Sequence, residues 1–514
     1  MRHFIIYLFV LLLGLTGCSD NLLNKVPVDK LSPSTFYKNE SEVDMGLMGI
    51  YSSFETPWWH AYEFMSDNGY CHHSWQGSLE FGAWLQTSTS ERAYEKWTVA
   101  YRTIARINMF LENIENAPIS EDVKREKSAE ARFIRAYFYT DLVHYYGDVP
   151  LILSTLSLEE AKVKRTPKKE VLKAATEDFD YAITNLPIEQ EEVGRVTRGA
   201  ALAFKARMFL YNEEWDSAAE TAKAVIDLGK YKLIDDYASI FEENNENNEE
   251  VIFDLQYMPN LRPQPWPSTS LSYSEWPTAG VTLSLIDDYY MINGKPITDP
   301  DSGYDEQKAM EGRDPRMAAT LVLPGSMFGT YTYIPANLDV EVQTCFRPRK
   351  YADINSTDRY NCGINIILMR YADVLLMRAE ALIESGDISQ EVYDLINLVR
   401  QRKSVGMPKI EDVEGIGLSQ AELRQIVRHE RRVEFAFEFT RYSDMRRWQL
   451  KEAVHDVWGF DKQKLKNPAN PLEWVFERVK LASRSFNERK GWLWPIPLEA
   501  VSYTHLTLPT ICSV

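Results

Sequence analysis

Residues 54–90 bring together side chains of the types that bind sugars. Flat aromatic faces stack on sugar rings, amide and carboxylate oxygens bond to hydroxyl groups, and the few rotatable bonds of Trp and Tyr keep the entropic cost of contact low. A core segment would be richer in Leu, Ile and Val. The segment contains Phe54, Trp58, Trp59, Tyr62, Tyr70, Trp75, Phe81 and Trp84, interleaved with Asp67, Asn68, His72, His73, Gln76 and Gln86. The pattern favours a binding surface, and packing of these rings against the rest of the chain is the alternative for each of them.

Residues 257–290 form a second segment of the same character. Its aromatic residues are Tyr257, Trp266, Tyr273, Trp276, Tyr289 and Tyr290, and five prolines lie between Pro259 and Pro277. Prolines at this density oppose regular helix. Binding residues are usually carried by loops on a rigid scaffold, so we expect both aromatic segments to be inserts that bind ligand.

Metal and catalytic motifs are weak in this sequence. Cys71, His72 and His73 have the side chains of metal ligands, but adjacent side chains diverge on a helix or a strand, so we expect no metal and no cofactor. No GxSxG elbow, HExxH motif or Gly-rich phosphate loop occurs. Two carboxylates in a cleft are enough for glycoside cleavage, and a glycoside hydrolase is therefore kept as an alternative class.

The scaffold that must position these residues is helical. Residues 91–115 place Tyr94, Trp97, Tyr101, Ile104, Ile107 and Leu111 at spacings of three and four, which predicts one apolar helix face. A second helix runs from Ser128 and ends at Gly147, shortly before Pro150. Strand-like alternation is sparse. These patterns predict an all-α protein.

Two segments read as helix–turn–helix units. The first runs from Thr197 with a polar turn at 212–214, and the second runs from Leu368 with its turn at 384–387. Lys205-Ala206 in the first unit corresponds to Arg378-Ala379 in the second. Units of this size, with alanines where helices cross, are similar to tetratricopeptide repeats. The predicted fold is a tetratricopeptide-like superhelix of helix pairs, interrupted by long irregular inserts that carry the ligand site.

The charged segment "VRHERRVEFAFEFTRYSDMRRW" is predicted to serve structure rather than acid–base chemistry. Its apolar stripe is Leu423, Ile426, Val427, Val433 and Phe437. Its charged residues are Glu430, Arg431, Glu434, Glu438, Arg441, Asp444 and Arg447, which can form i,i+3 and i,i+4 ion pairs on one helix. Aromatic neighbours of Arg441 and Asp444 indicate a partly buried network that orients the helix.

Composition excludes one class of partner. The formal net charge of −18 and the lack of a basic block argue against nucleic acid, whose binding depends on phosphate neutralisation. Cys345 and Cys362 either form a disulfide or are two separate buried thiols. No stretch after the leader has the ~20 apolar residues of a membrane-spanning helix.

The first 17 residues form a lipoprotein leader. Arg2 precedes the ten apolar residues 4–13, which rise only ~15 Å as a helix and match a signal-peptide core. Leu15-Thr16-Gly17-Cys18 then resembles the bacterial lipobox, in which the cysteine is lipidated and becomes the new amino terminus. We expect Cys18 to carry a lipid anchor, residues 18–35 to be a tether, and the lipid to be the protein's only contact with the membrane.

Six segments in order resemble the SusD/RagB family of Bacteroidetes outer-membrane lipoproteins. They are the lipobox, "AEARFIRAYFYTDLVHYYGDVPLI", "GRVTRGAALAFKARMFLY", "LMRYADVLLMRAEAL", "VRHERRVEFAFEFTRYSDMRRW" and "GWLWPIP". The resemblance implies a single all-α domain over residues 36–500, exposed on the outer surface of the outer membrane. It also implies a partner, a SusC-like TonB-dependent β-barrel transporter, to which a captured glycan is delivered. Binding in this family uses loop aromatics without covalent chemistry.

The resemblance also indicates candidate ligand residues. Asp67 in "MSDNGY" lies where relatives often have an acidic residue near the ligand. We expect Trp75 and Trp84 to be stacking platforms, with Asp67, Asn68 and Gln76 as hydroxyl partners. The further candidates are Trp58, Trp59, Tyr62 and Trp276. A peptide ligand is the alternative within the family, and a tetratricopeptide scaffold for proteins is the alternative outside it.

The last fourteen residues, "VSYTHLTLPTICSV", do not continue the family pattern. Val501 to Thr510 resemble a one-frame translation of a sequencing-library adapter. We therefore expect residues 501–514 to be foreign to the native protein, and assign His505 and Cys512 no functional role.

Overall fold

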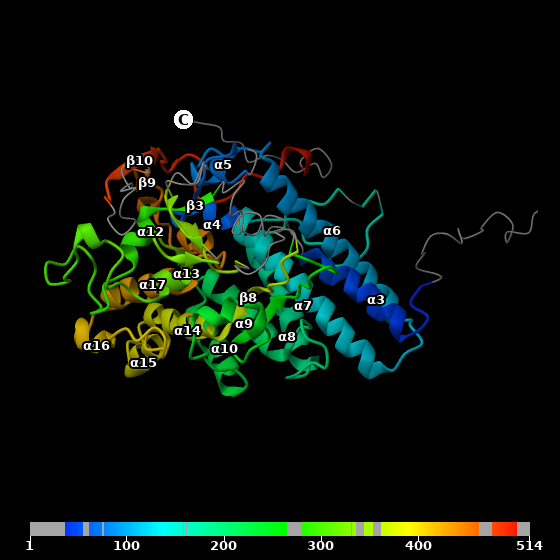
Figure 1. The fold of residues 1–514 in the computed structure, drawn as a ribbon. Coiled ribbons are helices and arrows are strands. Elements are labelled where there is room, and N and C mark those ends of the chain that lie inside the picture. Colours follow the sequence, from blue (N-terminus) through cyan, green and yellow to red (C-terminus); the bar gives the residue numbers. More distant parts are fainter. Residues whose placement is uncertain are drawn as a thin grey trace, which may run out of the picture.

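Helices dominate the described part of the chain, in which the strands form two-stranded pairs (Figure 1). The structure is a computed structural model that describes residues 36–54, 61–74, 77–157, 159–160, 162–264, 279–329, 331–335, 344–352, 361–461 and 475–500. Over these residues, no helix is both long and apolar enough to cross a bilayer. The all-α prediction is confirmed.

Three long helices form one end of the molecule (Figure 1). They are α3 (Glu40–Tyr51), α6 (Glu91–Ile114) and α7 (Glu121–Tyr146). The two predicted helices are confirmed, and α7 begins earlier than Ser128 because Ser120 caps the amide of Val123 and two acidic residues favour its first turn. It ends at Gly147, whose φ of 74° is a conformation that glycine adopts at little cost.

The two predicted helix–turn–helix units are α9 (Arg198–Tyr211) with α10 (Trp215–Asp227), and α14 (Tyr371–Ser385) with α15 (Gln390–Arg400). Helix α8 (Lys168–Asn185), which was not predicted, precedes them. Each packs on the next in space, α7 on α8, α9 on α10, and α10 on α14. Ala206 and Ala379 are fully buried, and Arg378 of α14 donates to the carbonyl of Ala219 on α10 at 2.8 Å. The second unit begins as a helix only at Tyr371, because residues 366–370 form a strand.

Short elements complete the described chain. The helices are η1 (Ser52–Phe54), α4 (Ala61–Met65), α5 (Ser78–Gly82), η3 (Ala238–Phe241), η4 (Glu243–Asn245), α12 (Leu283–Asp288), η5 (Glu306–Lys308), α13 (Arg316–Thr320), α16 (Ile410–Val413), α17 (Gln420–Phe435), α18 (Arg441–Arg447) and η7 (Lys451–Ala453). The antiparallel strand pairs are β1 (Gly69–Cys71) with β3 (Ala279–Val281), β2 (Val251–Leu255) with β8 (Ile366–Arg370), β4 (Leu321–Val322) with β7 (Arg347–Pro348), β5 (Met327–Phe328) with β6 (Tyr331–Thr332), and β9 (Val457–Phe460) with β10 (Arg478–Ala482).

The charged motif that was predicted to be one helix is two helices. Between α17 and α18, Phe437 and Phe439 have φ values of 62° and 66°, which a continuous helix does not allow. Most of the local ion pairs expected within this motif are therefore wrong. Among the described residues of the motif, Asp444 and Arg447 form the one i,i+3 pair. The structural role itself is confirmed, because the other charges pair with distant elements.

Glu434 illustrates this long-range pairing. It is fully buried on α17, and its carboxylate lies 2.7 Å from Arg370 Nη1, 2.9 Å from Arg316 Nη1 and 3.1 Å from Arg402 Nη2. Burial alone would raise the pKa of Glu434, but the three guanidinium groups outweigh it and hold the pKa well below its usual value. A charge network therefore ties α17 to β8 and α13.

The described residues form three apolar core clusters. The largest lies among the long helices, the second around α12 and β9, and the third around η3 and β8. Cys345 belongs to the second cluster and Cys362 to the third. Of the two interpretations of these cysteines, the structure favours separate buried thiols.

Candidate functional site

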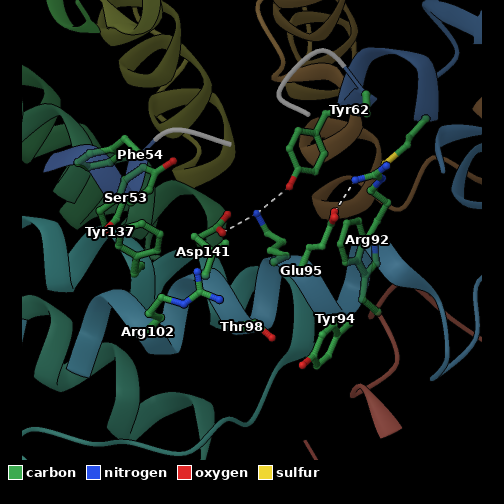
Figure 2. A pocket seen from close by; sticks show the side chains of 16 residues that line it. Ser53, Phe54, Tyr62, Arg92, Tyr94, Glu95, Thr98, Arg102, Tyr137 and Asp141 are labelled. Atoms are coloured by element: carbon green, nitrogen blue, oxygen red, sulfur yellow. Dashed lines mark hydrogen bonds and ion pairs between the residues drawn. The ribbon is translucent and has the colours of Figure 1, made fainter. Parts of the chain in front are cut away.

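A cavity of about 310 Å³ lies between α6, α7 and the segment that precedes them in the chain (Figure 2). This volume is at the lower end of the ~300–1,000 Å³ that is usual for small-molecule sites. Phe54 and Ala61, the described residues that flank 55–60 in the sequence, line it. The other lining residues are Ser53, Tyr62, Met65, Arg92, Tyr94, Glu95, Lys96, Thr98, Val99, Arg102, Tyr137, Phe138, Asp141 and Trp494.

Helix α6 supplies the floor of the cavity with one of its faces. Tyr94, Thr98 and Arg102 are spaced four residues apart, so they lie in a row along the helix, as Figure 2 shows. The opposite face of α6, with Ile104 and Ile107, is buried in the core. The helix is therefore held rigidly by its apolar face while its other face lines the cavity.

A lysine joins three elements at the inner wall of the cavity. Lys96 of α6 forms an ion pair with Asp141 of α7 at 2.5 Å and donates to the hydroxyl of Tyr62 on α4 at 3.0 Å (Figure 2). Its ammonium group also lies 4.2 Å from the ring centre of Tyr145, a cation–π distance. Because α4, α6 and α7 are all bound to one side chain, the relative positions of Tyr62 and Asp141 are fixed.

Tyr62 and Tyr137 are neutral hydrogen-bonding groups at physiological pH. Burial raises the pKa of Tyr62 well above its usual value, and the nearby Asp141 carboxylate raises it further. The pKa of Tyr137 is raised by the same two causes. Tyr94 is 39% exposed and presents its ring at the mouth. The cavity thus combines aromatic faces, phenol hydroxyls and charged groups, which suits non-covalent binding of a polyhydroxylated ligand.

Trp84, expected to stack on ligand, is instead a core residue. It is 1% exposed, and the rings of Tyr442, Phe486 and Trp492 lie around it at centroid distances of 5.1–6.0 Å. Its indole Nε1 donates to the carbonyl of Gly491 at 2.9 Å. No face of the ring is left for a sugar, so the structure corrects this prediction: the C-terminal segment, remote in sequence, covers the side chain.

Asp67 and Asn68 are also buried and engaged. Asp67 is 4% exposed and accepts hydrogen bonds from Arg441 Nε and Nη2 at 2.8 and 2.9 Å. Asn68 is fully buried, accepts from Arg432 Nε at 3.0 Å and donates to Glu63 at 3.1 Å. Both side chains hold α4 and β1 to α17 and α18, which corrects their predicted role as hydroxyl partners.

The remaining candidates divide into two groups. Tyr62 lines the cavity, as a ligand residue should. Cys18, Trp58, Trp59, Trp75, Gln76 and Trp276 lie outside the described residues and stay predictions. No cluster of three or more His, Cys, Asp or Glu side chains with metal-binding geometry is found in the described parts of the chain.

Sequence reasoning missed most of the residues that line the cavity. Tyr94 was assigned to the apolar face of its helix, although the structure exposes it. Lys96, Asp141 and Tyr137 gave no signal, because single charged or aromatic residues on a helix are usually solvated or packed. The i, i+4, i+8 row of Tyr94, Thr98 and Arg102 was the one pattern that could have indicated a second, polar face on α6.

Two family models match the chain. A model described as "SusD family" matches residues 238–505, which is more than half of the chain. A second, described as "Starch-binding associating with outer membrane", matches residues 22–210. The chain belongs to the SusD family. The resemblance found in the sequence motifs is therefore confirmed, and the second description associates such proteins with the outer membrane.

Individual relatives agree with this assignment. "SusD-like protein P2" of Formosa agariphila is 28% identical over 493 residues, covering 90% of this chain and 94% of its own. A SusD-like carbohydrate binding protein of Bacteroides fragilis NCTC 9343 has a crystal structure that is 28% identical, with a TM-score of 0.81, and covers 91% of this chain and 99% of its own. A further SusD-like protein of that strain is 27% identical with a TM-score of 0.82, covering 95% and 100%.

Membership of the SusD family defines the kind of site. Proteins of this family are glycan-binding proteins and not enzymes, so the glycoside hydrolase alternative is set aside. The cavity on α6 is the candidate binding site of this SusD-like protein.

Proposed function

We propose that this SusD-like protein is a lipid-anchored, cell-surface glycan-binding protein that captures oligo- or polysaccharide and delivers it to a TonB-dependent outer-membrane transporter. The observation that carries the proposal is the cavity on α6, whose tyrosines and charged side chains are those of a sugar site in a protein of the SusD family. The ligand contacts are with Tyr62, Tyr94 and Tyr137.

Sugar recognition at this cavity follows from its geometry. A pyranose ring has apolar C–H faces that stack on tyrosine rings and a rim of hydroxyls that exchange hydrogen bonds with charged groups. Tyr94 offers an accessible ring at the mouth, and Arg102, about two helical turns further along α6, is exposed. The Lys96–Asp141 pair lies at the inner wall of the cavity and supplies one basic and one acidic group. The site is thus a rigid one, which lowers the entropic cost of binding.

Delivery rests on the N-terminal segment. A lipid on Cys18 would keep the protein at the membrane, and residues 19–35 reach ~55 Å when fully extended. A tether of this length lets the domain move above the mouth of a transporter in the same membrane. The transporter is a SusC-like β-barrel, and the family description of outer-membrane association supports this location.

The test of glycan binding compares wild type with Tyr94→Ala against a panel of oligosaccharides by isothermal titration calorimetry. Loss of an accessible stacking ring should weaken binding by about 1–3 kcal/mol, if base stacking is a fair guide to sugar stacking. Trp458→Ala is the matched control, because Trp458 is 40% exposed on β9 and outside the cavity. Equal effects of the two substitutions would place the site elsewhere.

The partner is tested separately. The lipidated protein, purified from detergent-solubilised outer membranes, should bring down a β-barrel transporter that mass spectrometry identifies. Capture of a soluble protein instead would favour the tetratricopeptide scaffold. Binding of peptides but of no oligosaccharide in the panel would favour the peptide alternative.

A further inference from the structure

A small inner chamber continues the α6 cavity into the protein. It has a volume of about 100 Å³ and shares Tyr62, Lys96, Tyr137 and Asp141 with the cavity, so the two spaces adjoin at the Lys96–Asp141 pair. The chamber is too small for a whole sugar ring, but it has room for several water molecules. It is therefore suited to a substituent of a ligand that lies in the outer cavity.

The polar atoms left open in the chamber are nitrogen atoms. His144 Nε2 and Arg207 Nε are buried, and neither has a hydrogen-bond partner among the described residues. Arg207 is held in place from behind by Asp373, 2.6 Å from its Nη2, and by the carbonyl of Leu368 at 3.0 Å. A buried N–H without an acceptor is costly, so the chamber favours an occupant with oxygen acceptors.

The acceptors that line the chamber are already satisfied. Glu438 accepts hydrogen bonds from Arg370 and Lys350, each at 2.7 Å. Asp141 pairs with Lys96, and the Oγ of Ser443 lies 3.3 Å from the hydroxyl of Tyr145. These carboxylates carry compensated charge, so they oppose an incoming anion much less than isolated carboxylates would.

Cations are the charged groups that act most strongly on His144 in the chamber. The pKa of His144 is lowered well below its usual value, first by burial and then by the cations Arg446, Lys96, Arg447 and Lys168. The imidazole is therefore neutral at physiological pH, and one of its nitrogens carries a proton that it can donate. The exposed Arg102, whose side chain makes no ion pair with a described residue, adds positive charge at the mouth.

We infer that this protein selects an acidic glycan: a sugar ring lies in the α6 cavity, and its carboxylate or sulfate group enters the inner chamber, where Arg207 and His144 donate hydrogen bonds to it. The inference rests on the proposed glycan-binding function and narrows its ligand class. Charge-assisted hydrogen bonds from arginine to an oxyanion are about twice as strong as hydrogen bonds between neutral groups. A neutral hydroxymethyl group in the same place does not form such charge-assisted bonds with an anion.

The experiment measures affinity for matched pairs of ligands. One arm uses uronate oligosaccharides and their carboxyl-reduced neutral forms, and the other uses sulfated oligosaccharides and their desulfated forms. Wild type should bind the acidic member of one pair about 10- to 100-fold more tightly than the neutral member. The arm that shows the difference identifies the acidic group.

Two variants connect the preference to the chamber. His144→Phe keeps an aromatic ring 5.0 Å from Tyr211 but removes the nitrogen, and Arg207→Lys keeps the charge but removes Nε. Each should reduce the acidic-to-neutral affinity ratio to below about threefold while changing affinity for the neutral form little. Arg125→Gln, which removes an exposed positive charge at the start of α7, is the matched control and should keep the full ratio.

The outcomes separate the inference from the proposed function. Equal binding of acidic and neutral forms by wild type overturns the acidic preference and leaves glycan binding intact. A preference that survives in both folded variants overturns the assignment to the chamber. Binding of no oligosaccharide in either arm overturns the proposed function, and the inference with it.

Discussion

Asp67→Asn is expected to destabilise the protein and to leave ligand affinity unchanged. The sequence suggested Asp67 as a ligand residue, whereas the structure buries it between two arginines. Asparagine has nearly the same shape, so the substitution removes the negative charge without opening a cavity. The experiment therefore separates a structural carboxylate from a ligand-binding one.

The expected loss of unfolding free energy follows from the hydrogen bonds and the ion pair that Arg441 loses in Asp67→Asn. Both hydrogen bonds that its side chain makes within the described residues go to Asp67, and its side chain is only 8% exposed. Arg432 keeps its contacts with Asp288, Asn68 and Ser284. Removing one partner of a buried ion pair costs about 3–5 kcal/mol, and we expect the lower end because the asparagine carbonyl still accepts one hydrogen bond.

The pKa of Asp67 adds a pH signature. Burial by itself would raise that pKa, but Arg432 and Arg441 outweigh it and hold the pKa well below its usual range. The stabilisation is therefore present above about pH 4, where the unfolded carboxyl is ionised, and is lost as pH falls towards the folded value. The difference in unfolding free energy between wild type and Asp67→Asn should become smaller below about pH 4.

The assay is urea unfolding at pH 7, followed by circular dichroism, with calorimetric titration of the best-binding glycan on the folded proteins. Asp122→Asn is the control, because Asp122 forms an exposed pair with Arg125 that is worth at most about 1 kcal/mol. In an Arg441→Met background, Asp67→Asn should cost clearly less than in wild type. An unchanged unfolding midpoint combined with weaker glycan binding would refute the reasoning and restore Asp67 as a ligand residue.

Two further predictions concern other buried side chains. Glu63 is fully buried, and burial raises its pKa to about 7, so stability should fall by about 3 kcal/mol as pH rises from ~4.5 to ~7, where only the unfolded carboxyl ionises. Glu63→Gln should flatten the melting temperature across pH 4.5–8, and a variant as pH-dependent as wild type would contradict this. Trp84→Ala should cost about 3–5 kcal/mol in urea unfolding, with Trp84→Phe costing less, and glycan affinity should be the same for wild type and both folded variants. A loss of glycan affinity without a loss of stability would contradict this prediction and indicate that Trp84 contacts the ligand.

The helices were predictable because their signals are local. The turn at 212–214 lies between α9 and α10 as expected, since Thr197 caps the first helix and polar residues interrupt the apolar spacing. Helix α6 follows its predicted bounds within one residue. The break between α17 and α18 was not predictable, because the charged pattern continues through Phe437 and only the tertiary contacts of both sides impose positive φ there.

The sequence predicted the types of residue at the candidate site, but not which residues form it. Composition indicated aromatic residues near charged and amide groups, and Tyr62 does line the cavity. The sequence does not say which ring is covered: Trp84 meets the segment around Gly491, and Asp67 meets Arg441, partners hundreds of residues away. Such long-range contacts decide which side chains are buried and which charges pair. Helix propensity and the spacing of apolar residues reflect interactions over only a few residues, so they do not reveal these contacts.

The sequence by itself determined the helical character and the order of the family motifs, since both depend on short contiguous stretches of the chain. The tertiary structure decided that Lys96 joins Tyr62 to Asp141, and that His144 and Arg207 meet in one chamber. These groups come from four helices, α4, α6, α7 and α9, and only the packing of those helices brings their polar side chains within contact distance.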